Sequence, residues 1–198
     1  MALDSFPANL TLRDGTTFAV TPFQPSDSGA LLAFYSRLPE EDRLELRDDV
    51  TSDDWAAGFL RMVETREVIS LVAKTGGKVV GEATLYRSLH GWTRHVGELR
   101  VNVAPAYRRR GLATALASGQ VKIATDLGIE RIIVQVVDNQ LAARRTFEKM
   151  GFQKDATLRQ HVMDFAGQKR DLVILANDVC RIWASMEAVT QDYAPLLR

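Results

Sequence analysis

The stretch that decides the fold is "VNVAPAYRRRGLATAL", Val101–Leu116. It ends an alternating strand, turns at Pro105, carries three arginines at Arg108–Arg110 and continues as a helix from Gly111. The first turn of a helix has unpaired N–H groups and the positive end of the helix dipole, which both favour an anion. Gly111 has no Cβ, so the backbone can approach a ligand closely, and the arginines add positive charge. The stretch therefore predicts a strand–loop–helix site for a pyrophosphate-bearing ligand.

Hydrophobic periodicity outward from this stretch predicts a mixed α/β chain in the order β-α-α-β-β-β-α-β-α-β-β-α. The first three strands of the sheet core are expected to be antiparallel, because hairpins need only short turns, and the strand–helix–strand unit at 96–137 implies a parallel or splayed neighbour. The expected strands are 16–21, 68–74, 78–86, 96–103, 131–137, 152–162 and 170–176, and the expected helices are 27–38, 51–66, 111–127, 139–150 and the segment from 179 onward. Residues 1–176 would form one domain. Residues 177–198 would be a helical extension that packs on that domain or on the partner in a homodimer.

Composition narrows the function classes. Lys+Arg and Asp+Glu both number 25 in 198 residues, so the net charge is zero, and a dedicated nucleic-acid-binding domain is disfavoured. Cys180 is the single cysteine, which leaves no disulfide or cysteine-based zinc site within the chain. The three histidines have no metal-ligand spacing, so no metal is expected. No apolar run has the length of a membrane span and no secretion signal is visible, so we expect a cytoplasmic protein without a membrane partner.

The loop lacks both the Walker pattern and G-x-G-x-x-G, and it carries R-x-x-G-x-A instead, Arg108–Ala113. Together with "LRVNVAP" before it, and with "RIIVQVV" and "FEKMGF" after it, this motif resembles the GNAT superfamily of acyl-CoA-dependent N-acyltransferases. The resemblance covers roughly residues 18–176. It implies a GNAT-like fold, with a mostly antiparallel central sheet and helices on both faces, in which the fourth and fifth strands splay apart at a β-bulge. It also implies acetyl-CoA as the co-substrate.

The resemblance also implies the residues that hold the co-substrate. Backbone amides of the loop would bind the pyrophosphate, with the three arginines as an electrostatic rim. The pantetheine arm would bond to backbone groups of the fourth strand, near the asparagine that opens a later helix. The implied coenzyme A residues are Val101, Val103, Arg108, Arg109, Arg110, Gly111, Ala113, Thr114 and Asn139.

Glu98 is the candidate general base. An amine must lose a proton as it attacks a thioester, so a positioned proton acceptor is needed. Glu98 lies ten positions before Arg108, on the strand face shared with Arg100 and Asn102, and some GNAT lysine acyltransferases have a glutamate at this spacing. The alternative is a structural salt bridge from Glu98 to Arg100 or Arg94.

Phe147 departs from the family pattern. The residue four before the glycine of "TFEKMGF" is commonly a tyrosine that protonates the departing thiolate, and phenylalanine has no proton to give. Thr146, Tyr107 or a water would then supply the proton, or no side-chain acid is needed.

The resulting hypothesis is an N-acetyltransferase that acts on a primary amine by direct attack in a ternary complex. The opening "TPFQPSDSGALLAFYSRLPEEDR" resembles bacterial protein-lysine acetyltransferases, which favours a protein lysine over a small amine. An acidic segment at 40–54 is either a rim that attracts a cationic amine or an exposed helix face. The alternatives in function are a non-catalytic acyl-CoA-binding sensor and a nucleic-acid-binding protein.

Overall fold

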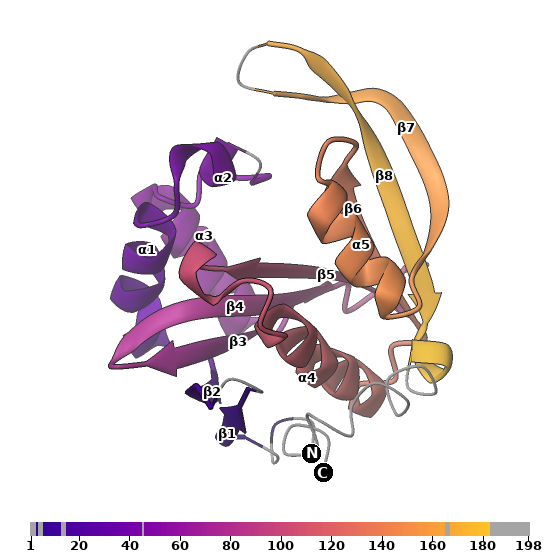
Figure 1. The fold of residues 1–198 in the computed structure, drawn as a ribbon. Helices are drawn as coiled ribbons and strands as arrows, with labels where there is room; N and C mark the ends of the chain where they lie inside the picture. Colours follow the sequence, from indigo (N-terminus) through magenta and orange to yellow (C-terminus); the bar gives the residue numbers. More distant parts are fainter. Residues whose placement is uncertain (1–2, 4–5, 13–14, 45, 165–166, 183–198) are drawn as a thin grey trace.

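An eight-stranded mixed sheet runs through the molecule in the order β1-β2-β3-β4-β5-β6-β8-β7 (Figure 1). The computed structural model describes residues 3, 6–12, 15–44, 46–164 and 167–182. The strands are β1 (Ala8–Thr11), β2 (Thr17–Pro22), β3 (Val68–Thr75), β4 (Lys78–Arg87), β5 (Val96–Val103), β6 (Arg131–Val137), β7 (Gln153–Met163) and β8 (Lys169–Asp178). The helices are α1 (Ser28–Ser36), α2 (Glu40–Leu44), α3 (Asp53–Glu64), α4 (Leu112–Asp126) and α5 (Leu141–Lys149), with 3₁₀ turns η1 (Pro25–Asp27) and η2 (Pro105–Tyr107). Every neighbouring pair of strands is antiparallel except β5 and β6, which are parallel.

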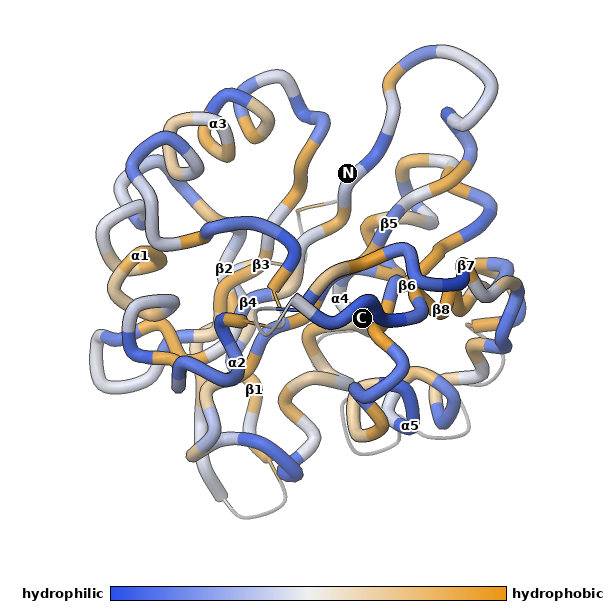
Figure 2. Tube along the Cα trace, turned by 90° about the horizontal axis from the view of Figure 1, so that it is seen from above, coloured by the Kyte–Doolittle hydropathy of each residue, from blue (hydrophilic) through white to orange (hydrophobic). Residues whose placement is uncertain are grey.

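The helices cover both faces of the sheet and bury two separate cores. α4 packs on one face and supplies seven residues to the larger core: Leu112, Ala115, Leu116, Ala117, Val121, Ile123 and Ala124. α1 and α3 pack on the other face over β3 and β4 and form the smaller core. Seen from above, the central strands carry most of the hydrophobic colour, and the long β7–β8 hairpin projects beyond the body (Figures 1 and 2). The expected α/β class and the mostly antiparallel sheet are confirmed.

Two helices show how local sequence sets the elements. α3 begins after Ser52, whose side chain accepts a hydrogen bond from the Trp55 N–H at 3.1 Å, and its apolar face packs through Phe59. α4 contains a glycine in mid-helix, which is unfavourable by propensity. A Cβ on Gly119 would lie 2.9 Å from Leu71 Cδ1, so the glycine permits the close approach of α4 to β3.

Several expected boundaries were wrong. β1 and the five-residue helix α2 were not predicted, because short elements carry too few periodic positions. α5 begins at Leu141 with Gln140 as its N-cap residue, so Asn139 does not open the helix. β8 continues through Asp178, two residues beyond the expected strand, because its last residues still pair with β6. A helical turn begins at Val179, and its first apolar residues are buried in the larger core. The rest of the expected terminal helix, from residue 183, lies outside the described residues.

Candidate functional site

The parallel pair β5 and β6 separates after three paired positions. Val96, Gly97 and Glu98 pair with β6, and beyond them β6 continues against β8 while β5 stays paired only with β4. The backbone edge of β5 from Leu99 to Val103 is therefore open on its β6 side. The register of β4 with β5 runs without a shift. The expected splay is present, but the expected β-bulge does not interrupt the β4–β5 ladder.

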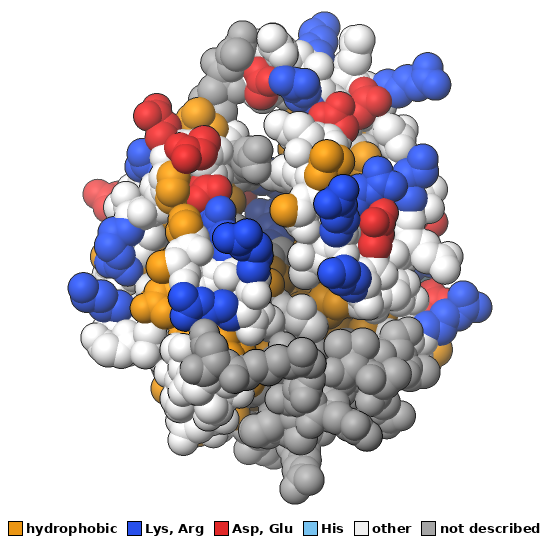
Figure 3. All heavy atoms as spheres, in the orientation of Figure 1, with side chains coloured by type: hydrophobic (Ala, Val, Ile, Leu, Met, Phe, Trp, Pro, Cys, Tyr) orange, Lys and Arg blue, Asp and Glu red, His pale blue; other side chains and the backbone are white. Residues whose placement is uncertain are grey.

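A cleft of about 760 Å³ occupies the splay between β5, the start of α4 and α5. Basic side chains gather on both walls of this hollow in the space-filling view (Figure 3). Eight of the nine residues expected to hold coenzyme A line the cleft: Val101, Val103, Arg108, Arg109, Gly111, Ala113, Thr114 and Asn139. Arg110 does not line it, and its guanidinium lies 5.9 Å from the centre of the Tyr107 ring instead.

The loop before α4 has the backbone that an anion site needs. Gly111 has φ of +92°, in the left-handed region, and is the N-cap residue of α4 without a side-chain cap. The amides of the first helical turn are therefore not satisfied by a capping side chain, and Ala113 and Thr114 of that turn line the cleft. Arg109 also has a positive φ, +58°. Two left-handed residues within three positions turn the chain sharply from η2 into the helix.

Arg108 is held by protein groups. Its Nε donates to the Val103 carbonyl at 2.9 Å, and its two terminal nitrogens donate to the Asp42 carboxylate at 3.0 and 2.7 Å. Asp42 comes from α2 and also lines the cleft. The arginine of the motif therefore ties α2 to the end of β5, and part of its charge is neutralised there. The acidic residue was not singled out from the sequence, because its partner is 66 positions away.

Glu98 lies at the point where β5 and β6 part. Its carboxylate accepts hydrogen bonds from Arg100 Nε at 2.8 Å, from Arg47 at 3.3 Å and from Gln135 of β6 at 3.3 Å. The salt bridge to Arg100 is thus present, and the partner Arg94 is not. The side chain keeps 18% exposure and does not line the large cleft.

Comparison with known proteins places the chain. Residues 30–152, more than half of its length, match the family described as "Acetyltransferase (GNAT) family". The chain belongs to the GNAT acetyltransferase family. It is an acyl-CoA-dependent N-acetyltransferase, and acetyl-CoA is its co-substrate. A sequence search of the curated proteins finds no match.

Solved GNAT structures share the fold. The GNAT domain of S. lividans PAT superposes with a TM-score of 0.72 at 23% identity, over 86% of this chain and 96% of that one. The ribosomal-protein-alanine N-acetyltransferase from Brucella melitensis gives 0.70 at 24% identity, over 80% and 98%. yncA, a putative acetyltransferase from Salmonella typhimurium with its cofactor acetyl-CoA, gives 0.69 at 22% identity, over 83% and 95%. At these identities the similarity concerns the fold.

Of the two candidate proton donors in this GNAT enzyme, Thr146 and Tyr107, only Thr146 lines the cleft. Phe147 is buried, packs edge-on against Phe152 in the core and does not line the cleft. Tyr107 packs against Phe18 and does not line the cleft. Thr146 does line it, and its hydroxyl donates to the Ala142 carbonyl one turn earlier at 3.0 Å.

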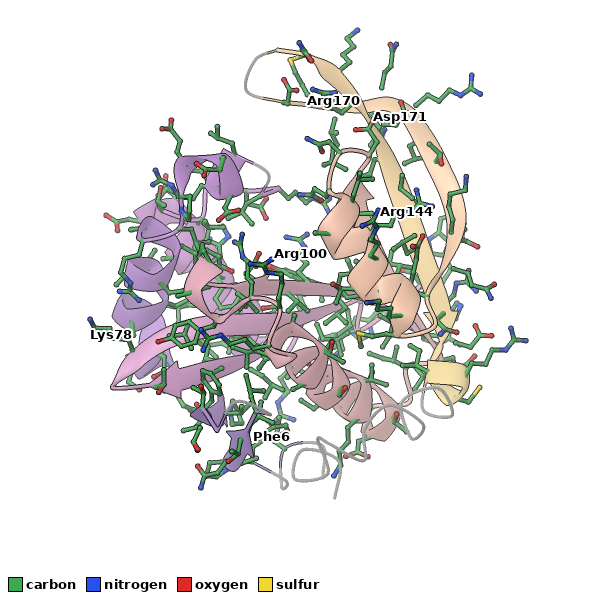
Figure 4. The ribbon with its side chains drawn as sticks, viewed as in Figure 1. Phe6, Lys78, Arg100, Arg144, Arg170 and Asp171 are labelled. Atoms are coloured by element: carbon green, nitrogen blue, oxygen red, sulfur yellow. The ribbon has the colours of Figure 1, made fainter. Side chains whose placement is uncertain are left out.

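A second, small pocket of about 40 Å³ adjoins the cleft under α1 and α3. Its walls include three aromatic rings, Tyr35, Trp55 and Tyr86, and two residues, Leu46 and Asn102, line both hollows. Arg100 lies in it with its guanidinium 4.1 Å from the centre of the Tyr86 ring and 2.9 Å from Asp48. Figure 4 shows Arg100 between the lobe of α1–α3 and the lobe of α5.

Two carboxylates of the acidic segment at 40–54 form ion pairs with arginines outside that segment. Asp42 pairs with Arg108, and Asp48 pairs with Arg100 of β5.

Among the described residues there is no cluster of three or more His, Cys, Asp or Glu side chains that could hold a metal ion. Within the same part of the chain, no helix is both long and apolar enough to cross a bilayer.

Proposed function

We propose that this enzyme transfers the acetyl group of acetyl-CoA to a primary amine, a protein lysine or a small amine, by direct attack in a ternary complex. The observation that carries the proposal is the meeting of the two hollows at Asn102 on β5. A donor in the large cleft and an acceptor in the small pocket would meet beside the open edge of β5.

The large cleft is proposed to hold the co-substrate. Its pyrophosphate would bind the amides of the first turn of α4, because the turn after Gly111 is uncapped and carries the positive end of the helix dipole. The pantetheine amides would bond to the open backbone edge of β5 at Val101 and Val103, with Asn139 on the opposite wall. Arg109 supplies positive charge at the rim, whereas the charge of Arg108 is partly neutralised by Asp42 of α2.

The chemistry requires a neutral amine. Its nitrogen lone pair forms the new N–C bond at the thioester carbonyl, the C–S bond breaks, and the sulfur leaves with the electron pair. The amine proton passes to Glu98, directly or through a water, and the thiolate takes its proton from water or from Thr146, the one of the two proposed side-chain donors that lines the cleft. The contacts of Glu98 with Arg47 and Arg100 hold its carboxylate at the mouth of the splay.

The general-base proposal is tested by E98Q. We expect the affinity for CoA, measured by calorimetry, to change less than about twofold, and kcat for an amine acceptor to fall about 100-fold or more, the usual contribution of a general base. E148Q is the matched control, since Glu148 also accepts a hydrogen bond from an arginine Nε, that of Arg144 at 2.7 Å, but lines neither hollow. A pH–rate profile of E98Q that overlays that of the wild type would contradict the assignment.

A further inference from the structure

The polar cluster under α1 centres on a buried glutamate. Glu82 of β4 is 1% exposed, and its carboxylate accepts hydrogen bonds from Tyr35 at 2.9 Å, from Ser70 at 2.9 Å and from Thr84. All three donors are neutral hydroxyl groups. Sequence reasoning gave this glutamate no role, although it pairs directly with Asn102 across the β4–β5 ladder.

The direction of each hydrogen bond follows from this arrangement. An ionised carboxylate can only accept hydrogen bonds, so the Tyr35 hydroxyl donates its single proton in the hydrogen bond to Glu82. The tyrosine oxygen can then only accept further bonds, and Asn102 Nδ2 donates to it at 3.2 Å. The amide orientation of Asn102 is thereby fixed. Within the described residues, no group donates to Asn102 Oδ1, which leaves this acceptor for a ligand.

Asn102 is also the polar side chain common to the two hollows. The small pocket, at about 40 Å³, has room for about one to three water-sized groups. That is enough for an amino group and the methylene that carries it. Rings of Tyr35, Trp55 and Tyr86 form its walls, and aromatic faces suit the carbons next to an amine.

We propose that Asn102 orients the acceptor: its Oδ1 accepts a hydrogen bond from the N–H of an unbranched primary amine, and Glu82 acting through Tyr35 holds the amide in that orientation. The proposal rests on acetyl transfer to an amine as the proposed function and names its acceptor class. A hydrogen bond through N–H leaves the nitrogen lone pair for the thioester carbonyl. Asn102 would be a substrate-contacting residue, and Tyr35 and Glu82 would be positioning residues.

The charge state of Glu82 controls this orientation. Burial raises the pKa of Glu82, against the opposing effects of the hydrogen bonds from Tyr35 and Ser70 and of the Arg100 charge. The other titratable groups that face it are Tyr35 from α1 and Tyr86 from β4, and burial raises the pKa of both, so both stay neutral. When Glu82 is protonated, its own O–H can donate to the Tyr35 oxygen, so Tyr35 does not have to donate to Glu82. Tyr35 can then donate to Asn102 Oδ1, and the amide would present Nδ2 to the amine instead.

The main experiment uses n-butylamine and its isomer sec-butylamine as acceptors, with acetyl-CoA and the full chain. We expect n-butylamine to be preferred at least tenfold in kcat/KM, because branching at the carbon next to nitrogen exceeds the small pocket. In N102L the KM for n-butylamine should rise at least tenfold, while the Kd for CoA stays within about twofold. N177L is the control, since Asn177 also donates through Nδ2, to the Gly151 carbonyl, outside both hollows.

The positioning role has its own readouts. Y35F should raise the KM for n-butylamine with a smaller effect on kcat, and E82Q should make that KM insensitive to pH in the range where the wild-type KM rises on acidification. The Asn102 side-chain amide should exchange slowly with solvent in the wild type and rapidly in Y35F, measured by NMR.

An unchanged KM in N102L, or equal use of the two isomers, would overturn the inference while acetyl transfer itself stands. If the wild type acetylates neither amine, the proposed function fails on these acceptors. The NMR comparison then still decides the amide orientation, and equal exchange in the wild type and Y35F would overturn it.

Discussion

The two hollows on either side of β5 are built in different ways. In the large cleft, the proposed donor site, the end that would bind the pyrophosphate is formed by backbone and small side chains at Gly111, Ala113 and Thr114. The acceptor pocket is lined by large aromatic and charged side chains from α1, α3, β4 and β5. The donor side is thus set by backbone conformation, and the acceptor side by side-chain contacts across strands and helices. Substitutions should accordingly act through backbone strain on one side and through hydrogen bonding on the other.

The largest effect should come from backbone strain on the donor side. G111V places a β-branched residue at φ of +92°, which costs about 1–2 kcal/mol or more, and it places a side chain where the phosphate would bind. We expect CoA to bind at least tenfold more weakly by calorimetry. R109A should weaken binding less, because the helix amides remain.

G128V is the matched control for G111V, since Gly128 has φ of +70° at the other end of α4 with nothing within 4 Å of an added Cβ. It should lower the melting temperature through the same kind of strain and leave the Kd for CoA unchanged. Equal loss of CoA affinity in both variants would mean that strain, not the cleft, explains the G111V result.

An intermediate effect is expected from the buried carboxyl on the acceptor side. Because burial raises the pKa of Glu82, the folded chain holds this proton more tightly than the unfolded chain. Protonated Glu82 stabilises the folded chain fully at pH values below the pKa of Glu82 in the unfolded chain. This stabilisation is lost as the pH rises through the pKa of Glu82 in the folded chain. The unfolding free energy of the wild type relative to E82Q should therefore fall with pH by up to about 1.4 kcal/mol per unit, measured by denaturation at several pH values.

Asp49 is a comparison for the denaturation experiment, because its pKa shift has the opposite sign to that of Glu82. Hydrogen bonds from the Thr51 side chain and backbone lower the pKa of Asp49, so its contribution is present above the unfolded pKa and is lost as pH falls through the folded one. D49N should therefore be less stable than the wild type at neutral pH, and this difference should disappear at acidic pH. If E82Q shows no pH-dependent difference from the wild type, Glu82 does not titrate as proposed.

The smallest effect should come from the ion pair that joins the two sides. D42N removes a carboxylate from the rim of the donor cleft and releases Arg108. Because Arg108 is 42% exposed, solvent screening keeps the effect small, and we expect CoA to bind about two- to fivefold more tightly at low salt. The gain should shrink with added salt, and D48N, which lies outside the donor cleft, should not show it. Weaker binding by D42N would mean that Arg108 needs Asp42 to shape the loop.

Local patterns predicted the donor side better than the acceptor side. Gly111 and the helix after it are neighbours in sequence, so a few residues carry both the conformation and the anion site. Asn139 lines the cleft, but its expected capping role was wrong, because the helix starts two residues later. Glu98 was selected as an isolated candidate, and its contacts with Arg47 and Gln135 link segments 51 and 37 positions away.

The sequence by itself determined the order of strands and helices apart from β1 and α2, the alternation of β5, and the position of a glycine at the start of α4. These features depend on residues close together in the chain, where periodicity and backbone preference act directly. Only the tertiary structure decided that Tyr35 reaches Glu82, that Asp42 neutralises Arg108 and that Asn102 lies between the two hollows. Those contacts join α1 to β4, α2 to the loop before α4, and the small pocket to the cleft. The physical reason is that a hydrogen bond needs two groups within about 3 Å, and only packing of distant segments brings them there.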